Sequence, residues 1–179
     1  MTVLEMPEQV RPTAAGWNFE SLVRQHQSMV FSIVWHILRD RPVAEELAQD
    51  VFLSLHQHLG ELESPEHVQF WLRKVASNRA LDVARRRLRR PMVSLENAPE
   101  PVSVSDPGDP MLGTALQKLV AALPEKARAI VVLRYQEDLD PAEIARVLGI
   151  PVGTVKSQLQ RALGLLRQKL ARSLGEIGI

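Results

Sequence analysis

Arginine is concentrated at one place in the chain. Five arginines fall within Arg85–Arg90, and the stretch Trp71–Arg90 holds eight basic residues against a single acidic one, Asp82. Guanidinium groups at this density suit contacts with phosphates, because each stays charged and offers a planar fork of donors. Asp82 can pair with Arg85 or Arg86 at helical spacing, which orders part of the cluster. The pattern indicates nucleic-acid binding, with a solvated charge run as the alternative.

The segment Asp140–Arg161 has the spacing of a helix-turn-helix. Asp140, followed by proline, suits the start of a helix, and Gly149 suits its end, where a positive φ is expected. Ala145 is small enough for a close crossing of two helices. Thr154 is placed to cap the second helix. The segment therefore predicts two short-linked helices of the kind that dock on duplex DNA.

The second of these helices has one apolar and one polar face. On a helical wheel the apolar side consists of Val155, Leu159, Ala162 and Leu166. The N-terminal part of such a helix enters the major groove, where polar side chains meet base edges and phosphates. The predicted duplex-reading residues are Thr154, Lys156, Ser157, Gln160 and Arg161. An ordinary solvated helix face is the alternative.

Helical periodicity extends over most of the 179 residues, of which 45% are hydrophobic and 4% aromatic. This composition favours an all-α fold of packed helices. Asn18 precedes the first helix, Asp40, Arg41 and Pro42 separate it from the second, Gly60 closes the second, and Ser64 resembles the N-cap of the third. The expected helices are 19–38, 43–59, 67–88, 114–123, 124–135, 141–148 and 152–174.

Proline marks a boundary between two small helical domains. The stretch Pro91–Leu112 has five prolines and four acidic residues but no basic residue, which predicts an extended acidic linker. The expected organisation is a flexible N-terminal tail (1–18), a helical domain (19–90), the linker (91–112), a helix-turn-helix domain (113–172) and a C-terminal tail (173–179). The acidic stretch Pro42–Glu66, with six acidic residues and no lysine or arginine, predicts a surface for a basic partner.

Several function classes find no support in the sequence. The absence of cysteine excludes disulfides and fits a reducing cytoplasm. The N-terminus lacks the pattern of a signal peptide, and the longest apolar stretch, Met29–Leu38, is too short to span a bilayer. His56 and His58 point in divergent directions on a helix, so we expect neither a metal site nor a cofactor. Without a phosphate loop or a nucleophile–base pair, an enzyme is not predicted.

In this order the motifs resemble the extracytoplasmic-function (ECF) sigma factors, the minimal branch of the sigma-70 family. The likeness covers about Phe19–Leu170. In the first domain it rests on AEELAQDVF at 44–52, FWL at 70–72, Asn78, and ALD at 80–82 before the arginines. In the second domain it rests on LPEKAR at 123–128, LRY at 133–135, EIA at 143–145, LGI at 148–150 and VGTVKS at 152–157.

The resemblance implies a sigma region 2-like domain that recognises and melts the −10 promoter element, and a region 4-like domain that reads the −35 element as duplex. The −10 contacts are then expected from Asn78, Arg79, Arg85 and Arg86. An amide such as that of Asn78 suits a flipped base, with a structural hydrogen bond inside the fold as the alternative. Gln158 and Gln160 depart from the usual recognition helix, so the family's −35 preference is not carried over.

The resemblance also implies the partners: promoter DNA, core RNA polymerase and, as an expectation, an anti-sigma factor. Glu46, Gln49, Asp50 and Leu53 are expected to face the clamp helices of the largest polymerase subunit, and the C-terminal domain the flap region. The expected function is promoter recognition and DNA melting as a cytoplasmic protein. The alternative is a two-domain helix-turn-helix regulator that binds duplex operators without core polymerase.

Overall fold

The computed structural model describes residues 16–89 and 110–175, and all regular elements in these two ranges are helical. This confirms the all-α fold class. The α-helices are α1 (Phe19–Leu38), α2 (Arg41–His58), α3 (Pro65–Arg89), α4 (Pro110–Ala121), α5 (Glu125–Tyr135), α6 (Pro141–Leu148) and α7 (Val152–Gly175), with a short 3-10 helix, η1, at Leu59–Glu61. The predicted extended linker (91–112) and the two predicted tails fall largely outside the described residues, but α4 begins at Pro110, so the last three residues of the predicted linker belong to a helix.

Side-chain caps begin the helices where the sequence predicts them. Asn18, Asp40 and Ser64 each accept a hydrogen bond from a backbone N–H three residues further on, at 3.0 to 3.1 Å. At the start of α6, Asp140 and Glu143 form a capping box with two bonds of 2.8 Å. These bonds satisfy donors that a helix N-terminus otherwise leaves without partners.

The helix ends agree less closely with the sequence expectations. Gly149 ends α6 in the left-handed region, at φ 64°, as predicted. Gly60 does not close α2, because α2 ends at His58 and Gly60 lies inside η1. Thr154 is not the cap of α7: that helix begins at Val152, and the carbonyl of Pro151 accepts the bond from the Thr154 N–H at 3.0 Å.

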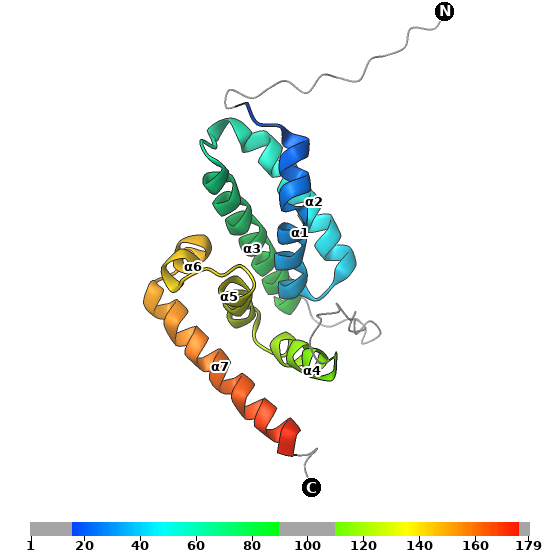
Figure 1. Ribbon diagram of the computed structural model, residues 1–179, viewed down its shortest axis with the longest axis vertical. Coiled ribbons are helices and arrows are strands. Elements are labelled where there is room, and N and C mark those ends of the chain that lie inside the picture. Colours follow the sequence, from blue (N-terminus) through cyan, green and yellow to red (C-terminus); the bar gives the residue numbers. More distant parts are fainter. Residues whose placement is uncertain (1–15, 90–109, 176–179) are drawn as a thin grey trace, which may run out of the picture.

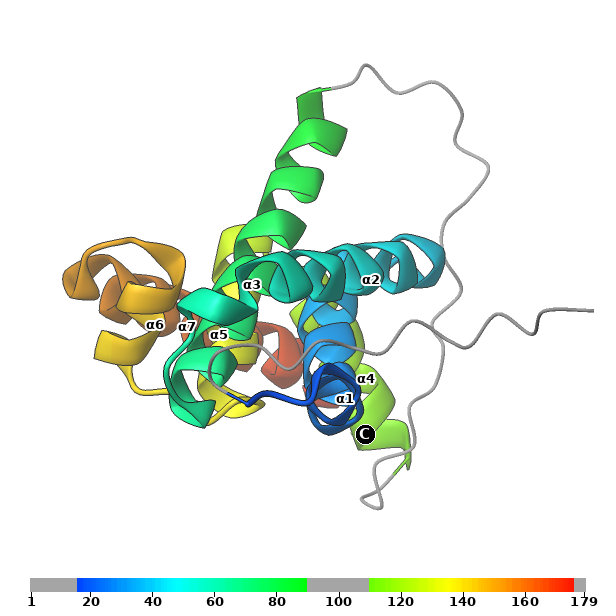
Figure 2. The ribbon, with the colours of Figure 1, turned by 90° about the horizontal axis from the view of Figure 1, so that it is seen from above.

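The N-terminal helices α1, α2 and α3 form one bundle, in the upper half of Figure 1. Its core is aliphatic, because the facing sides of the three helices carry alanine, valine, leucine and isoleucine. The buried residues include Val30, Ile33, Val34, Ile37, Val51, Leu55, Val68, Leu72, Ala76 and Ala80. Figure 2 shows the C-terminal end of α3 projecting beyond this bundle.

The C-terminal helices do not stand apart from the N-terminal bundle. α5 packs against α1 and α3, and α6 packs against α3, so one hydrophobic cluster runs through both halves of the chain (Figure 1). A second, smaller cluster joins α5 to α7 and consists of Leu123, Ala127, Val131, Ala162 and Leu166. The sequence predicts two helical domains but gives no sign of this contact between them.

Candidate functional site

Asn78 lies on the side of α3 that faces α6. Its side-chain nitrogen donates to the carbonyl of Lys74 at 2.9 Å and to the carbonyl of Val147 at 3.0 Å. The first bond stays within α3, and the second crosses to the last turn of α6. An amide nitrogen carries two donor hydrogens, so both of these are in use. The residue predicted to read a base is therefore tied to the helix-turn-helix half of the chain.

Arg79 points the other way, toward α2. It donates to the carbonyl of Asp50 at 3.0 Å and to the hydroxyl of Ser54. These bonds fasten α3 to α2 along the middle of the bundle. Arg79 thus has a structural contact, and its DNA contact stays a prediction.

The remaining −10 candidates lie on the projecting end of α3 (Figure 2). Arg85 and Arg86 are exposed. Arg85 pairs with Asp82 at 3.4 Å, which confirms the pairing expected from their spacing, although the two side chains are 61% and 55% exposed. Arg87 pairs with Asp40 at 2.8 Å and holds this end of α3 to the start of α2. The structure therefore presents Arg85 and Arg86 to solvent on an ordered helix.

The predicted duplex-reading residues share the outer side of α7. Lys156, Gln160 and Arg161 are exposed, while Thr154 and Ser157 are half-buried. The Ser157 hydroxyl donates to the carbonyl of Thr154 at 3.0 Å. On the opposite side Val155, Ala162 and Leu166 are buried and Leu159 is partly buried, as the helical wheel predicts. The polar side of the helix is therefore open to a large partner.

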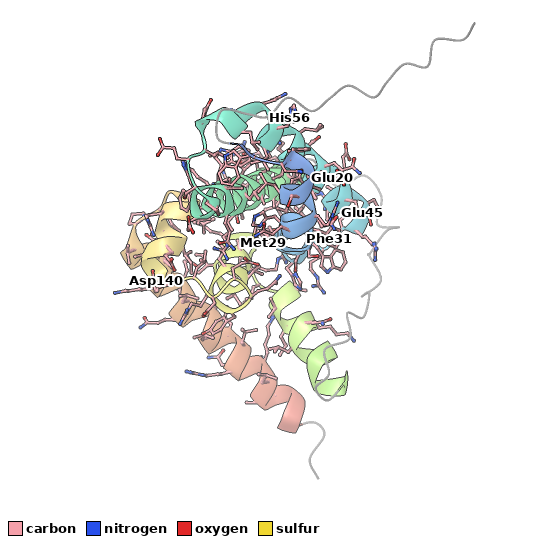
Figure 3. The ribbon with its side chains drawn as sticks, turned by 45° about the horizontal axis from the view of Figure 1, so that its top comes forward. Glu20, Met29, Phe31, Glu45, His56 and Asp140 are labelled. Carbon is pink, nitrogen blue, oxygen red and sulfur yellow. The ribbon has the colours of Figure 1, made fainter. Side chains whose placement is uncertain are left out.

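The predicted polymerase-binding residues form one exposed strip on α2, which we call the α2 strip: Glu46, Gln49, Asp50 and Leu53. Leu53 is 63% exposed, an unusual position for a leucine in a short helical bundle. A shallow groove of about 390 Å³ between α1 and α2 borders this strip. Figure 3 labels Phe31 and Glu45, which lie on the two helices that line the groove.

The two histidines of α2 make aromatic contacts. The His56 ring meets Phe19 edge-on, with 5.0 Å between centroids, and the His58 ring lies 5.6 Å from that of Trp71. His56 is labelled in Figure 3. In the described part of the chain, histidine, aspartate and glutamate nowhere form a group of three suited to a metal ion. None of the described helices is long and apolar enough to cross a membrane.

Arg128 is a buried residue with no role predicted from the sequence. It is 8% exposed and donates to the carbonyls of Ala121 and Leu123 in its own half and of Ile37 at the end of α1. Burial lowers the pKa of Arg128, and nearby Glu125 partly offsets this. The LPEKAR motif at 123–128 marks the residue in the sequence, but nothing there indicates a bond to α1.

A second buried contact joins the two halves. Nε of Arg73 on α3 lies 3.0 Å from Oε2 of Glu137, just after α5, and their side chains are only 17% and 8% exposed. His26 on α1 is also buried. The pKa of His26 is lowered, first by its burial and then by the positive charge of Arg73. A neutral His26 avoids placing a second positive charge beside this ion pair.

Comparisons with known proteins identify both halves of the chain. Residues 22–90 match the family Sigma-70 region 2, and residues 113–166 match the family Sigma-70, region 4. The chain is 33% identical over 169 residues to the ECF RNA polymerase sigma factor SigE of Mycolicibacterium smegmatis, covering 91% of this chain and 65% of SigE, so it spans less than two thirds of that relative. It is 32% identical over 160 residues to the ECF RNA polymerase sigma factor SigM of Mycobacterium tuberculosis, covering 89% of this chain and 78% of SigM.

A solved structure shows the same fold. The sigma factor RpoE of Bartonella quintana, crystallised with the anti-sigma factor NepR, superimposes with a TM-score of 0.66 at 19% identity. The match covers 86% of this chain and 96% of that chain.

Proposed function

The chain belongs to the ECF sigma factors of the sigma-70 family, which are non-enzymatic RNA polymerase subunits that direct promoter recognition, and we propose how its surfaces divide this work. The observation that carries the proposal is that regions 2 and 4 follow each other in one chain. The domain at 19–90 binds core polymerase and opens the −10 element, and the domain at 113–172 reads the −35 element. The working place of such a subunit is the cytoplasm. A duplex-binding regulator without polymerase would not need a region 2 domain.

The −10 site consists of Asn78 and the arginines that follow it on α3. Arg85 and Arg86 are exposed and bind phosphates, while Arg79 orients α3 through its bonds to α2. Asn78 hydrogen-bonds the pairing edge of a base that has left the stack. The amide is suited to this because it both donates and accepts.

The −35 site is the outer side of α7. The exposed side chains of Lys156, Gln160 and Arg161 extend from the first three turns of the helix and reach base edges and phosphates. Thr154 and Ser157 lie at the edge of this surface and contact the backbone of the duplex. The buried opposite side holds α7 against α5, which fixes the angle at which the helix is presented.

Core polymerase binds at two places. The α2 strip combines two carboxylates with an exposed leucine and faces the clamp helices of the largest subunit. In the C-terminal half Leu116 and Leu165, 45% and 44% exposed, offer an apolar surface on α4 and α7 for the flap region. An anti-sigma factor is a further partner, since the similar RpoE was crystallised with one.

The proposal is tested by adding the purified chain to core RNA polymerase from the organism that carries it. We expect a stable complex and transcripts that begin at specific genomic sites where core polymerase alone does not initiate. The measurement is gel filtration of the complex, followed by mapping of the 5′ ends of transcripts. Specific binding to duplex operators by the chain alone, with no complex with core, supports the duplex-binding regulator instead.

Reversing the charge of the α2 strip should weaken binding to core polymerase. Glu46→Lys combined with Asp50→Lys replaces two carboxylates that face a basic partner surface, and we expect a loss of affinity of at least about tenfold. Both side chains are exposed, so the fold should be preserved. The matched control is Glu61→Lys with Glu63→Lys, which makes the same change in net charge at exposed positions outside the strip. Equal affinities for the two double variants remove the strip from the interface.

A further inference from the structure

The start of α7 is a short apolar tip, which consists of Pro151, Val152 and Gly153. All three residues are exposed, Val152 to 37%, and the first charge along the helix is that of Lys156, one turn further on. Figures 1 and 2 both place α6 and the start of α7 at an outer edge of the molecule. In a helix-turn-helix this end of the second helix enters the major groove. The part of α7 that leads into the groove therefore offers apolar atoms and backbone, not charge.

Gly153 in this tip is not required by the fold. Its φ is not positive, and a Cβ atom added to it would meet no atom of the described residues within 4 Å outside its own stretch of helix backbone. Glycine in a helix is less favourable than alanine, because its backbone loses more conformational freedom on folding. An alanine at this position would fit the free chain and suit α7 better. Nothing within the described residues explains the missing side chain.

Free space alone does not single out Gly153, because Gly60 and Gly164 also have free space around them. What distinguishes Gly153 is its position in α7. It precedes Gln160 by seven residues, or about two helical turns, so it lies on the side of the helix that is proposed to read the −35 element. Gly164 lies on the same side but roughly 16 Å further along the helix, beyond the proposed reading residues.

The dimensions of the groove explain why a missing side chain matters at the start of this helix. The major groove of B-form DNA is about 12 Å wide, and an α-helix with its side chains has a diameter of about 10 to 12 Å. A helix that enters the groove by its N-terminal end therefore has little free space around its first turn. Glycine is the residue that allows the closest approach of a backbone to a ligand. Without a side chain at position 153, the first turn can come close to base edges that a Cβ atom would keep at a distance.

We propose that Gly153 is a positioning residue of the −35 site, because its missing side chain allows the first turn of α7 to enter the major groove deeply. This depth brings Lys156, Gln160 and Arg161 within reach of bases and phosphates. The inference rests on the proposed reading of the −35 element by α7. It adds a residue that acts through the absence of a side chain and that favours DNA binding over the stability of its own helix.

The test compares holoenzymes that carry Gly153→Ala or Gly153→Leu with the unmodified holoenzyme. Binding is measured on duplex promoter fragments mapped with the unmodified holoenzyme, with the −35 element intact or substituted. On the intact element we expect Gly153→Ala to weaken binding about tenfold and Gly153→Leu to weaken it further, because the added side chains hold α7 away from the bases. On the substituted element neither variant should cause a further loss. In urea unfolding of the free chain, Gly153→Ala should unfold at an equal or higher urea concentration than the unmodified chain.

The matched control is Gly164→Ala, which makes the same change on the same side of α7 but far from its first turn. This variant should bind the promoter like the unmodified holoenzyme. The proposal is overturned if Gly153→Ala binds the intact element as tightly as the unmodified holoenzyme, or if it loses affinity equally on both templates. A lower unfolding midpoint for Gly153→Ala also overturns it, since the glycine then serves the fold. If substituting the −35 element does not affect the unmodified holoenzyme, the proposed reading by α7 is itself wrong.

Discussion

Arg128→Ala is expected to lower the free energy of unfolding by about 3 kcal/mol, because the substitution leaves buried carbonyls without a donor and opens a cavity. The guanidinium serves the carbonyls of Ala121, Leu123 and Ile37, and the residue is only 8% exposed. Among the described side chains, only that of Arg128 donates to the Ile37 carbonyl. Urea unfolding followed by circular dichroism measures the change.

The control for this substitution is Arg24→Ala. Arg24 pairs with Glu20 at 2.6 Å, but the two side chains are 73% and 81% exposed, and such surface pairs contribute little. Arg128→Lys keeps the charge and loses the planar fork, so it should fall between the alanine variant and the unmodified chain. If Arg128→Ala and Arg24→Ala unfold at the same urea concentration, Arg128 does not hold the helices together.

The helices could be predicted because their signals are local. Asn18, Asp40 and Asp140 cap within three residues of themselves, and the apolar spacing of α1 and α6 gives their bounds. Gly149 was predictable because a helix end at positive φ favours glycine. The prediction of Thr154 as a cap was wrong because a threonine ahead of an apolar stripe resembles a cap. In the structure α7 begins at Val152, and the carbonyl of Pro151 accepts the bond from the Thr154 N–H.

The candidate site could be predicted only in part. Composition and spacing indicated the exposed arginines of α3 and the polar side of α7, and the resemblance to the sigma family indicated the residues of the α2 strip, since each set lies within one helix. The bond from Asn78 to Val147 joins residues 69 positions apart, and the bond from Arg128 to Ile37 joins residues 91 positions apart. No local pattern encodes such pairs, because each partner is a backbone carbonyl that any residue would offer.

The two DNA-reading sites should fail at different steps of initiation. Arg161→Ala removes an exposed cationic fork from α7, and the loss of one base or phosphate contact costs about 1 to 3 kcal/mol, so promoter binding by the holoenzyme should weaken roughly 5- to 150-fold. The control is Arg172→Ala, an exposed arginine near the opposite end of the same helix. Binding is measured on duplex promoter fragments mapped with the unmodified holoenzyme.

Asn78→Ala should leave that duplex binding intact and reduce strand opening and −10 selectivity. The substitution also removes the bond from Asn78 to the carbonyl of Val147 on α6. Permanganate reactivity of exposed thymines reports opening, and Gln57→Ala on the exposed side of α2 is the control. A template melted in advance around the −10 element should restore opening but not discrimination between bases. The bases of such a template are already unstacked, whereas the hydrogen bonds that the Asn78 amide makes to a base are still missing in the variant.

Testing Arg161→Ala and Asn78→Ala on several promoter templates shows whether the two sites act at separate steps or form a single DNA-binding surface. On a −35-substituted template, Arg161→Ala should cause little further loss, because its contact is already absent, whereas Asn78→Ala should still reduce opening. Independent sites give effects that add in the double variant. If Asn78→Ala weakened duplex binding as much as Arg161→Ala and left opening and −10 selectivity unchanged, Asn78 would serve only to join α3 to α6, and the −10 site would have to lie among the exposed arginines at the end of α3.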